Sequence, residues 1–195
     1  MARLKTEKRQ NMIIDEAMKI IHSGGYGALS IRALAQNVKI SEPAIYRHFL
    51  NKEDIVLGIL NRIMVFEQLV ETELLTKKTA KEKIKHFILF RLKYLEKNPE
   101  MTSVLFAEDI FTQSEILRNR MFSMLQKRKR MLADIIEDAK SEGEIADVKT
   151  ENLLIIIFGS IRMIVLEWRL NNFKFSLAGR GKSMLNTLDK LIFTS

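Results

Sequence analysis

The feature that most constrains the fold is the segment 29–57, LSIRALAQNVKISEPAIYRHFLNKEDIVL. Its pattern predicts two short helices joined by a tight turn and followed at once by a longer helix. Ser30, Ser41 and Asn51 each stand where a helix N-cap is expected. Pro43 falls in the first turn of the second short helix, where its missing N–H does little harm.

The two short helices also carry the three parts that a helix-turn-helix needs, which are a supporting helix, a turn and a recognition helix with a polar face. The expected turn covers residues 37–40, and the small side chain of Ala35 lets the two helices approach closely. The shared apolar core is expected to contain Leu34, Ala35, Val38, Ile40, Ile45 and Phe49. The residues left outside or at the edge of that core are Glu42, Pro43, Ala44, Tyr46, Arg47 and His48.

The rest of the chain favours an all-α fold of about nine helices. Only two prolines and eight glycines interrupt the 195 residues, and no strand-like alternation of useful length occurs. Outside the two short helices, apolar spacing predicts helices over 6–22, 51–75, 80–97, 100–111, 114–140, 150–171 and 181–193. We expect a DNA-binding domain over residues 1–50 and a helical regulatory and dimerisation domain over 51–195, with the helix 51–75 as the connection.

Charge permits a polyanionic partner but does not locate its binding site. The net charge is +8. Residues 1–55 hold nine Lys/Arg and six Asp/Glu, giving +3, and the other 140 residues hold 23 and 18, giving +5.

The basic start MARLKTEKRQ is followed by no apolar signal region, and the most apolar run, 153–166, is short for a membrane span and contains Arg162. The absence of cysteine excludes disulfides and thiolate metal sites. We expect a cytoplasmic protein without membrane contact.

The segment resembles the DNA-binding domain of the TetR family of transcriptional regulators, over about residues 13–60. The matching residues are Ala17, Gly25, Ser30, Ile31, Leu34, Ala35, Val38, Ser41, Ile45, Tyr46, His48, Phe49, Lys52 and Glu53. One position departs from the family pattern, because Lys39 stands in the turn where the family usually has glycine. If that residue has a positive φ, lysine there costs roughly 1 kcal/mol.

The resemblance implies double-stranded DNA as a partner and assigns roles residue by residue. Arg32 matches a position that reaches a base or a phosphate, and Lys52 matches one that contacts the DNA backbone. The major-groove face is expected to contain Glu42, Pro43, Ala44 and Tyr46, with Tyr46 and His48 also near the backbone. Chemistry agrees, since arginine donates to guanine and an alanine or proline can touch a thymine methyl. The complete set of expected DNA-binding residues is Arg32, Ser41, Glu42, Pro43, Ala44, Tyr46, Arg47, His48 and Lys52.

The last two expected helices suggest a homodimer. The run LLIIIF at 153–158 has apolar residues on every side, which predicts a helix buried all round, and Gly159 permits close helix approach. The resemblance implies a four-helix interface, and the alternative is a core helix of a monomer. The expected interface residues are Ile155, Phe158, Gly159, Arg162, Leu166, Leu185, Leu188 and Ile192. In a dimer, two recognition helices about 34 Å apart match a palindromic site.

The middle helices carry many aromatic and Met side chains, which suit an adaptable apolar pocket for a small-molecule effector. The expected lining is Phe90, Tyr94, Phe106, Phe111, Phe122, Met163 and Trp168, and the alternative is that these residues form ordinary core. The basic run at 127–130 is either a second anion-binding surface or a solvated helix face.

These features predict a regulator, in the first instance a repressor that an apolar effector releases from a palindromic operator. The alternative is a ligand-independent DNA-binding factor of the nucleoid-occlusion type that acts through a protein partner. An enzyme is not expected, because the three histidines lie in separate segments without metal-ligand spacing. The sequence also shows no glycine-rich phosphate loop and no nucleophile elbow, so neither a metal nor a cofactor is expected.

Overall fold

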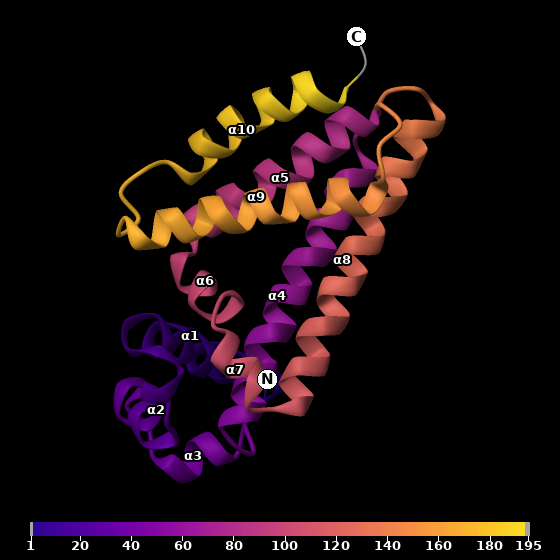
Figure 1. Ribbon diagram of the computed structural model, residues 1–195. Helices are drawn as coiled ribbons and strands as arrows, with labels where there is room; N and C mark the ends of the chain where they lie inside the picture. Colours follow the sequence, from indigo (N-terminus) through magenta and orange to yellow (C-terminus); the bar gives the residue numbers. More distant parts are fainter. Residues whose placement is uncertain (1, 194–195) are drawn as a thin grey trace. The chain divides into compact units, whose positions relative to one another are not determined.

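The computed structural model describes residues 2–193, which form ten helices (Figure 1). Their bounds are α1 Ala2–Ala28, α2 Ile31–Val38, α3 Glu42–Tyr46, α4 Lys52–Leu75, α5 Ala80–Lys97, α6 Pro99–Leu105, α7 Glu108–Thr112, α8 Glu115–Ser141, α9 Thr150–Leu170 and α10 Leu177–Ile192. The all-α prediction is confirmed. None of the helices in the described range is long and apolar enough to cross a membrane.

The helices form two compact units. The first contains the residues up to 65 together with 100–124, and the second contains 66–99 and the residues from 125 onward. Both α4 and α8 contribute residues to each unit. The first unit therefore combines the helix-turn-helix with α6, α7 and the beginning of α8, although these segments are far apart in the sequence.

In the first unit, α1 provides the apolar face on which the short helices pack. Ile13, Ala17 and Ile21 are almost completely buried, and so are Leu34 of α2 and Ile45 of α3. The expected stop at the glycine pair is confirmed, because Gly25 has φ 74° and ψ 177°, which lie outside the helical range. A short helical stretch follows this kink and continues to Ala28, so the span of α1 is longer than expected.

Two predicted helix starts are confirmed by their hydrogen bonds. The Ser30 hydroxyl accepts from the Ala33 N–H at 3.1 Å, and Asn51 Oδ1 accepts from the Asp54 N–H at 2.8 Å. Ser41 occupies the N-cap of α3, but its side chain makes no capping hydrogen bond. The short helix α3 therefore depends more on its neighbours than the sequence suggested.

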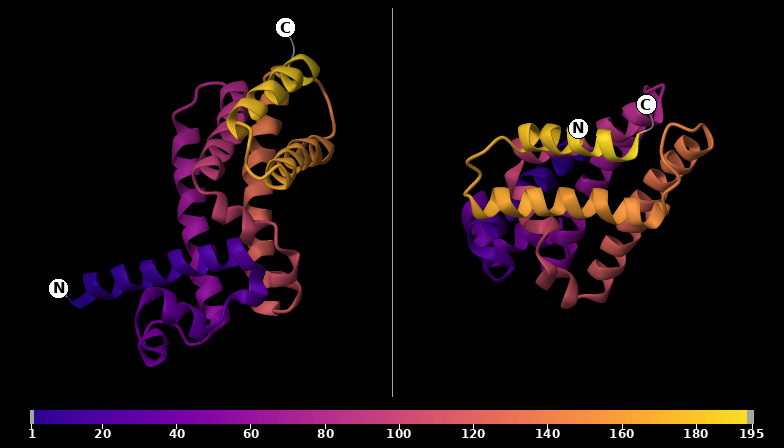
Figure 2. Two further views of the ribbon diagram at one scale, coloured as in Figure 1. Left: turned by 90° about the vertical axis from the view of Figure 1, so that its left-hand side faces the viewer. Right: turned by 45° about the horizontal axis from the view of Figure 1, so that its top comes forward.

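In the second unit, α5, α9 and α10 pack against one another, and Figure 2 shows α9 and α10 running alongside each other. Gly181 of α10 lies close to α5, since an added Cβ would be 2.2 Å from Cδ1 of the buried Leu92. The ring of Phe87 meets that of Phe158 edge-on at 5.8 Å. The start of α5 is fixed by a capping box between Thr79 and Glu82.

Two further helix predictions need correction, and one of them explains why ten helices form instead of nine. The helix expected over 100–111 is broken after Leu105 into α6 and α7, with residues 106–107 outside both. The last helix begins at Leu177 and not at 181. Its N-cap is Ser176, whose hydroxyl accepts from the Gly179 N–H at 3.0 Å, so the two glycines that follow lie inside the first helical turns.

Candidate DNA-binding interface and effector region

The turn between α2 and α3 is closed by a left-handed residue. Lys39, which replaces the glycine usual in the family, has φ 58° and ψ 47°. This position therefore does have a positive φ. Its N–H donates to the Gln36 carbonyl at 3.3 Å, and the Ile40 N–H donates to the Ala35 carbonyl at 3.0 Å. These bonds hold the two short helices at a fixed angle. The lysine side chain is exposed and adds a positive charge beside the turn.

The polar face of this helix pair is open to solvent. Tyr46 is 52% exposed, whereas Ile45 and Phe49 on the opposite side are buried. The other predicted contact residues divide into the exposed Arg32, Ser41, Glu42, Pro43 and Arg47 and the partly buried Ala44, His48 and Lys52. The helix pair therefore presents the polar residues together on the surface, as a helix entering the major groove requires.

Lys52 has a partner that the sequence did not reveal. Its Nζ donates to the Tyr26 carbonyl oxygen at 2.6 Å and lies 3.6 Å from the centre of the Tyr26 ring. Burial lowers the pKa of Lys52 from its ordinary value and raises the pKa of Tyr26. The ammonium group is thus held against Tyr26 near the end of α1, and only its remaining N–H donors are available to a phosphate.

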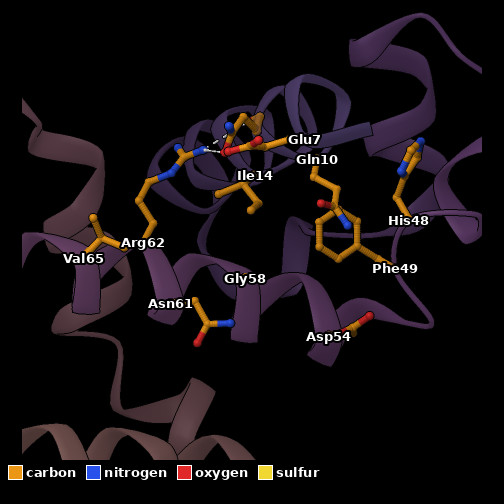
Figure 3. Close-up of a pocket in the computed structure, with 11 residues that line it drawn as sticks. Glu7, Gln10, Ile14, His48, Phe49, Asp54, Gly58, Asn61, Arg62 and Val65 are labelled. Carbon is orange, nitrogen blue, oxygen red and sulfur yellow. Dashed lines mark hydrogen bonds between the residues drawn. The ribbon is translucent and has the colours of Figure 1, made fainter. Parts of the chain in front are cut away.

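His48 is one of the residues that line a hollow of about 490 Å³, whose lining comes from α1, α4 and the chain between α3 and α4 (Figure 3). Its Nδ1 is shielded from solvent and makes no hydrogen bond with the described residues. On the far side of the hollow, Arg62 pairs with Asp15 and donates to Asn11 Oδ1 at 3.0 Å. Gly58 of α4 packs closely against α1, since a Cβ at this position would lie 3.0 Å from Ile14 Cδ1.

The residues predicted to line an effector pocket do not form one cluster within either unit. Phe90 and Tyr94 both stack on Phe66 of α4, with ring centres 5.7 and 3.8 Å away, and His86 stacks on Phe90 at 5.1 Å. Trp168 is buried and donates from Nε1 to the Phe175 carbonyl at 2.9 Å. Met163 is 63% exposed. The remaining three, Phe106, Phe111 and Phe122, belong to the first unit.

The second unit contains a buried group of charges that was not predicted from the sequence. Arg91 of α5 is only 5% exposed and pairs with Glu67 of α4, which also pairs with Arg128 of α8 at 2.7 Å. A signal was present, because Arg91 interrupts the otherwise apolar buried face of α5 that includes Phe87, Ile88 and Leu92. By contrast, the described residues contain no group of three or more His, Asp or Glu side chains able to hold a metal ion.

The predicted dimer residues fall into two classes. In the single chain α9 is not buried all round, because Ile155 is 68% and Leu166 42% exposed, and Gly159 and Arg162 lie on the same open side. The exposed apolar face of α9 consists of Ile155, Ile156, Met163, Leu166 and Leu170. Phe158 is half-buried against its own chain. On α10 the predicted residues Leu185, Leu188 and Ile192 are already buried in the single chain, where α10 packs on α5 and α9. Their part in a dimer interface stays a prediction.

Comparison with known proteins agrees with this architecture. The family model described as bacterial regulatory proteins of the tetR family matches residues 13–59, and the model described as the C-terminal region of YsiA-like proteins matches residues 60–192. A fatty acid metabolism regulator protein of Bacillus subtilis is 29% identical over 181 residues, 90% of this chain and 91% of the relative. A nucleoid occlusion factor SlmA of Vibrio campbellii is 24% identical over 180 residues, 88% of each chain.

Solved structures give the same result. The transcriptional regulator FadR of Bacillus subtilis, in complex with stearoyl-CoA, has a TM-score of 0.79 at 26% identity and covers 91% of this chain and 96% of its own. FadR of Bacillus halodurans has the same TM-score at 21% identity, covering 92% and 93%. Together the two family models span nearly the whole chain, and the family consists of DNA-binding regulators that are not enzymes. The chain belongs to the TetR family of transcriptional regulators and has a YsiA-like C-terminal region.

Proposed function

We propose that this regulator binds a palindromic operator as a homodimer and is released from it by a fatty acyl effector, in the first instance an acyl-CoA thioester. In this proposal residues 1–50 contact DNA and residues 51–195 bind the effector and the second copy. The observation that carries the effector class is the similarity to the stearoyl-CoA complex, which extends over 91% of this chain. Because its partner is chromosomal DNA, we expect it to act in the cytoplasm.

The DNA part of the proposal is supported by the exposed face of α2 and α3. Tyr46, Arg32 and Arg47 are exposed and can reach base edges or phosphates. The dimer part is supported by the exposed apolar face of α9, because a contiguous apolar patch of this kind on a soluble protein marks an interaction surface. With two copies related by a two-fold axis, the same face would serve on both protomers.

The first experiment is to identify the operator by genomic footprinting and then measure its affinity by fluorescence anisotropy with and without lauroyl-CoA. We expect release by lauroyl-CoA and none by free CoA. Native mass spectrometry of the purified protein supplies the dimer mass and any acyl compound that copurifies. Unchanged operator affinity in saturating lauroyl-CoA, with the ligand shown to be bound, would contradict the proposed regulation.

Substitutions on the polar face test the DNA contacts. Tyr46→Ala or Arg32→Ala should weaken operator binding by about 1–3 kcal/mol if the residue reads a base. Lys52→Ala should weaken binding to all sequences and lower the salt slope by about one if Lys52 contacts a phosphate. Lys19→Ala, which removes an exposed charge from α1 in the same unit, is the matched control.

A second candidate function is that of a DNA-binding factor of the nucleoid-occlusion type. It is supported by the 24% identity to a SlmA protein over 88% of the chain. The two functions predict different binding maps. A metabolic regulator should occupy a small number of promoters and leave them when acyl-CoA is added. A nucleoid-occlusion factor should occupy many scattered chromosomal sites, ignore acyl-CoA and retain a cell-division protein in a pull-down.

A further inference from the structure

The group of charges around Arg91 links three helices of the second unit. Arg91 of α5 donates from Nη2 to Glu67 of α4, and from Nη1 to the Phe87 carbonyl at 3.2 Å. Arg128 of α8 donates to the other Glu67 oxygen at 2.7 Å. The side chains of Glu67, Arg91 and Arg128 are 13%, 6% and 17% exposed. One carboxylate therefore lies between two largely buried guanidinium groups.

The charges and hydrogen bonds of this group are not balanced. Two arginines and one glutamate leave an excess of one positive charge, and the nearby Glu71 is already paired with Lys127 at 2.8 Å. The Nε atoms of Arg91 and Arg128 are both shielded from solvent, and neither has a hydrogen-bond partner among residues 2–193. Leaving a buried charged donor unsatisfied is unfavourable, so such groups usually have a partner. An anionic ligand that reaches the two guanidinium groups would therefore compete with Glu67 for their N–H donors.

The surroundings indicate what kind of anion would fit. Phe66 directly precedes Glu67 on α4, and Phe90 directly precedes Arg91 on α5. The rings of Phe66, Phe90 and Tyr94 stack on one another between the same two helices, α4 and α5, and the Arg91 guanidinium lies 3.7 Å from the centre of the Phe87 ring. An apolar stack next to excess positive charge suits an amphipathic molecule with a hydrocarbon chain and an anionic end. Burial lowers the pKa of Arg91 to about 10, which still leaves it charged at neutral pH.

We propose that Arg91 and Arg128 form the subsite for the anionic group of the effector, and that Glu67 is an internal carboxylate that occupies their inner donors when the effector is absent. This inference rests on the proposed function, in which the effector is a fatty acyl compound. The anionic group is a carboxylate if the effector is a free fatty acid and a phosphate if it is an acyl-CoA. Both accept two parallel hydrogen bonds from an arginine.

Competition with Glu67 connects this subsite to DNA release. Glu67 lies on α4, the helix that begins at Lys52 directly after the helix-turn-helix. When the effector anion takes the arginine donors, α4 loses its ion pairs to α5 and α8. A ligand shifts a conformational equilibrium only through such a difference in contacts between two states.

The test is calorimetric titration of the full chain with three probes, which are lauroyl-CoA, laurate and the neutral lauryl alcohol. Arg128→Gln removes one arginine but leaves the Arg91–Glu67 pair in place, so the core keeps its buried ion pair. Glu67→Gln removes the competing charge and keeps an acceptor oxygen. Lys127→Gln is the control, because it removes the neighbouring positive charge, which is 57% exposed and paired with Glu71. Thermal melts of every variant report folding separately.

We expect Arg128→Gln to lower the affinity for an anionic probe about tenfold or more, because a charge-assisted pair is lost. The affinity for lauryl alcohol should stay within about twofold of the wild-type value. Glu67→Gln should strengthen the binding of the same anionic probe. Lys127→Gln should change the affinity neither for the anionic probe nor for lauryl alcohol. Loss restricted to laurate identifies a carboxylate subsite, and loss restricted to lauroyl-CoA identifies a phosphate subsite. If folded Arg128→Gln and Glu67→Gln bind the anionic probes as the wild type does, the inference is wrong while the proposed function stands. If the wild type binds none of the probes, both fail.

Discussion

Replacing Ile155 by glutamate tests whether the exposed face of α9 joins two copies of the chain. Ile155 is 68% exposed in the single chain. Full burial of an isoleucine side chain stabilises by about 1.5–3 kcal/mol, so covering this exposed part contributes about 1–2 kcal/mol. In a two-fold symmetric interface the substitution occurs twice, giving a loss of about 2–4 kcal/mol. A loss of this size raises the dissociation constant of the dimer by a factor of between about 30 and about 1000.

The assay is sedimentation velocity over a dilution series, with operator binding measured at the same concentrations. We expect Ile155→Glu to shift the protein to monomer and to weaken operator binding in parallel, because two half-sites are then no longer bound together. Leu75→Glu is the matched control, since Leu75 is 86% exposed at the end of α4 and lies outside α9. An Ile155→Glu protein that dimerises as tightly as the Leu75→Glu protein would refute the assignment of this face.

Three further predictions concern the second unit. Gly181→Ala should lower the free energy of unfolding in urea by up to about 2 kcal/mol, because overpacking against Leu92 exceeds the gain in helix propensity, and a rise would contradict the packing. Thr79→Ala should lower stability by about 1 kcal/mol by removing the cap on the Glu82 N–H, measured in the same way, and an unchanged midpoint would argue against the capping box. Burial, and then the charge of Lys77, lower the pKa of His86, so the unfolded chain binds a proton more readily. Stability should therefore fall as the pH drops below about 6.5, the ordinary pKa of histidine. In thermal melts the His86→Gln protein should lose less stability than the wild type over the same fall in pH. An equal loss would exclude His86 as a source of the pH dependence.

Much of the helix-turn-helix could be predicted because its determinants are local. Ser30 and Asn51 cap helices by bonding to N–H groups three residues later, and such signals are contained in the sequence around them. The burial of Ile45 and the exposure of Tyr46 follow from helical periodicity in the same way. Even the positive φ at Lys39 was anticipated as a possible strain, because glycine is the usual residue there.

The features that were not predicted depend on contacts between distant segments. The break between α6 and α7 contains Phe106 and Ala107, neither of which is a helix breaker, so only packing within the unit can place it. The glycine pair predicts the interruption at Gly25 but not the short helical stretch that follows it to Ala28.

The candidate sites show the same limit. The position of Lys52 in the motif suggested a phosphate anchor, but its bond to the Tyr26 carbonyl arises only when α1 and α4 come together. The ion pairs of Glu67 likewise join three helices whose mutual placement no periodicity reveals. For α10, apolar spacing identified a buried side but could not tell an intramolecular partner from a second copy. Leu185 and Leu188 therefore belong to the core of their own chain.

The composition of the first unit bears on how regulators of this kind can be recombined. His22 Nδ1 lies 2.8 Å from the Ser103 hydroxyl, and Ser114 donates to Glu53, so side chains from 100–124 complete the structure around the first helices. Val104, Ile110 and Leu117 are fully buried in the same unit. A chimaera made at a single crossover would join one parent's DNA-reading helices to the other parent's supporting residues. Exchange of operator specificity between two such proteins should therefore succeed more often when the segment 100–124 is transplanted together with the N-terminal residues.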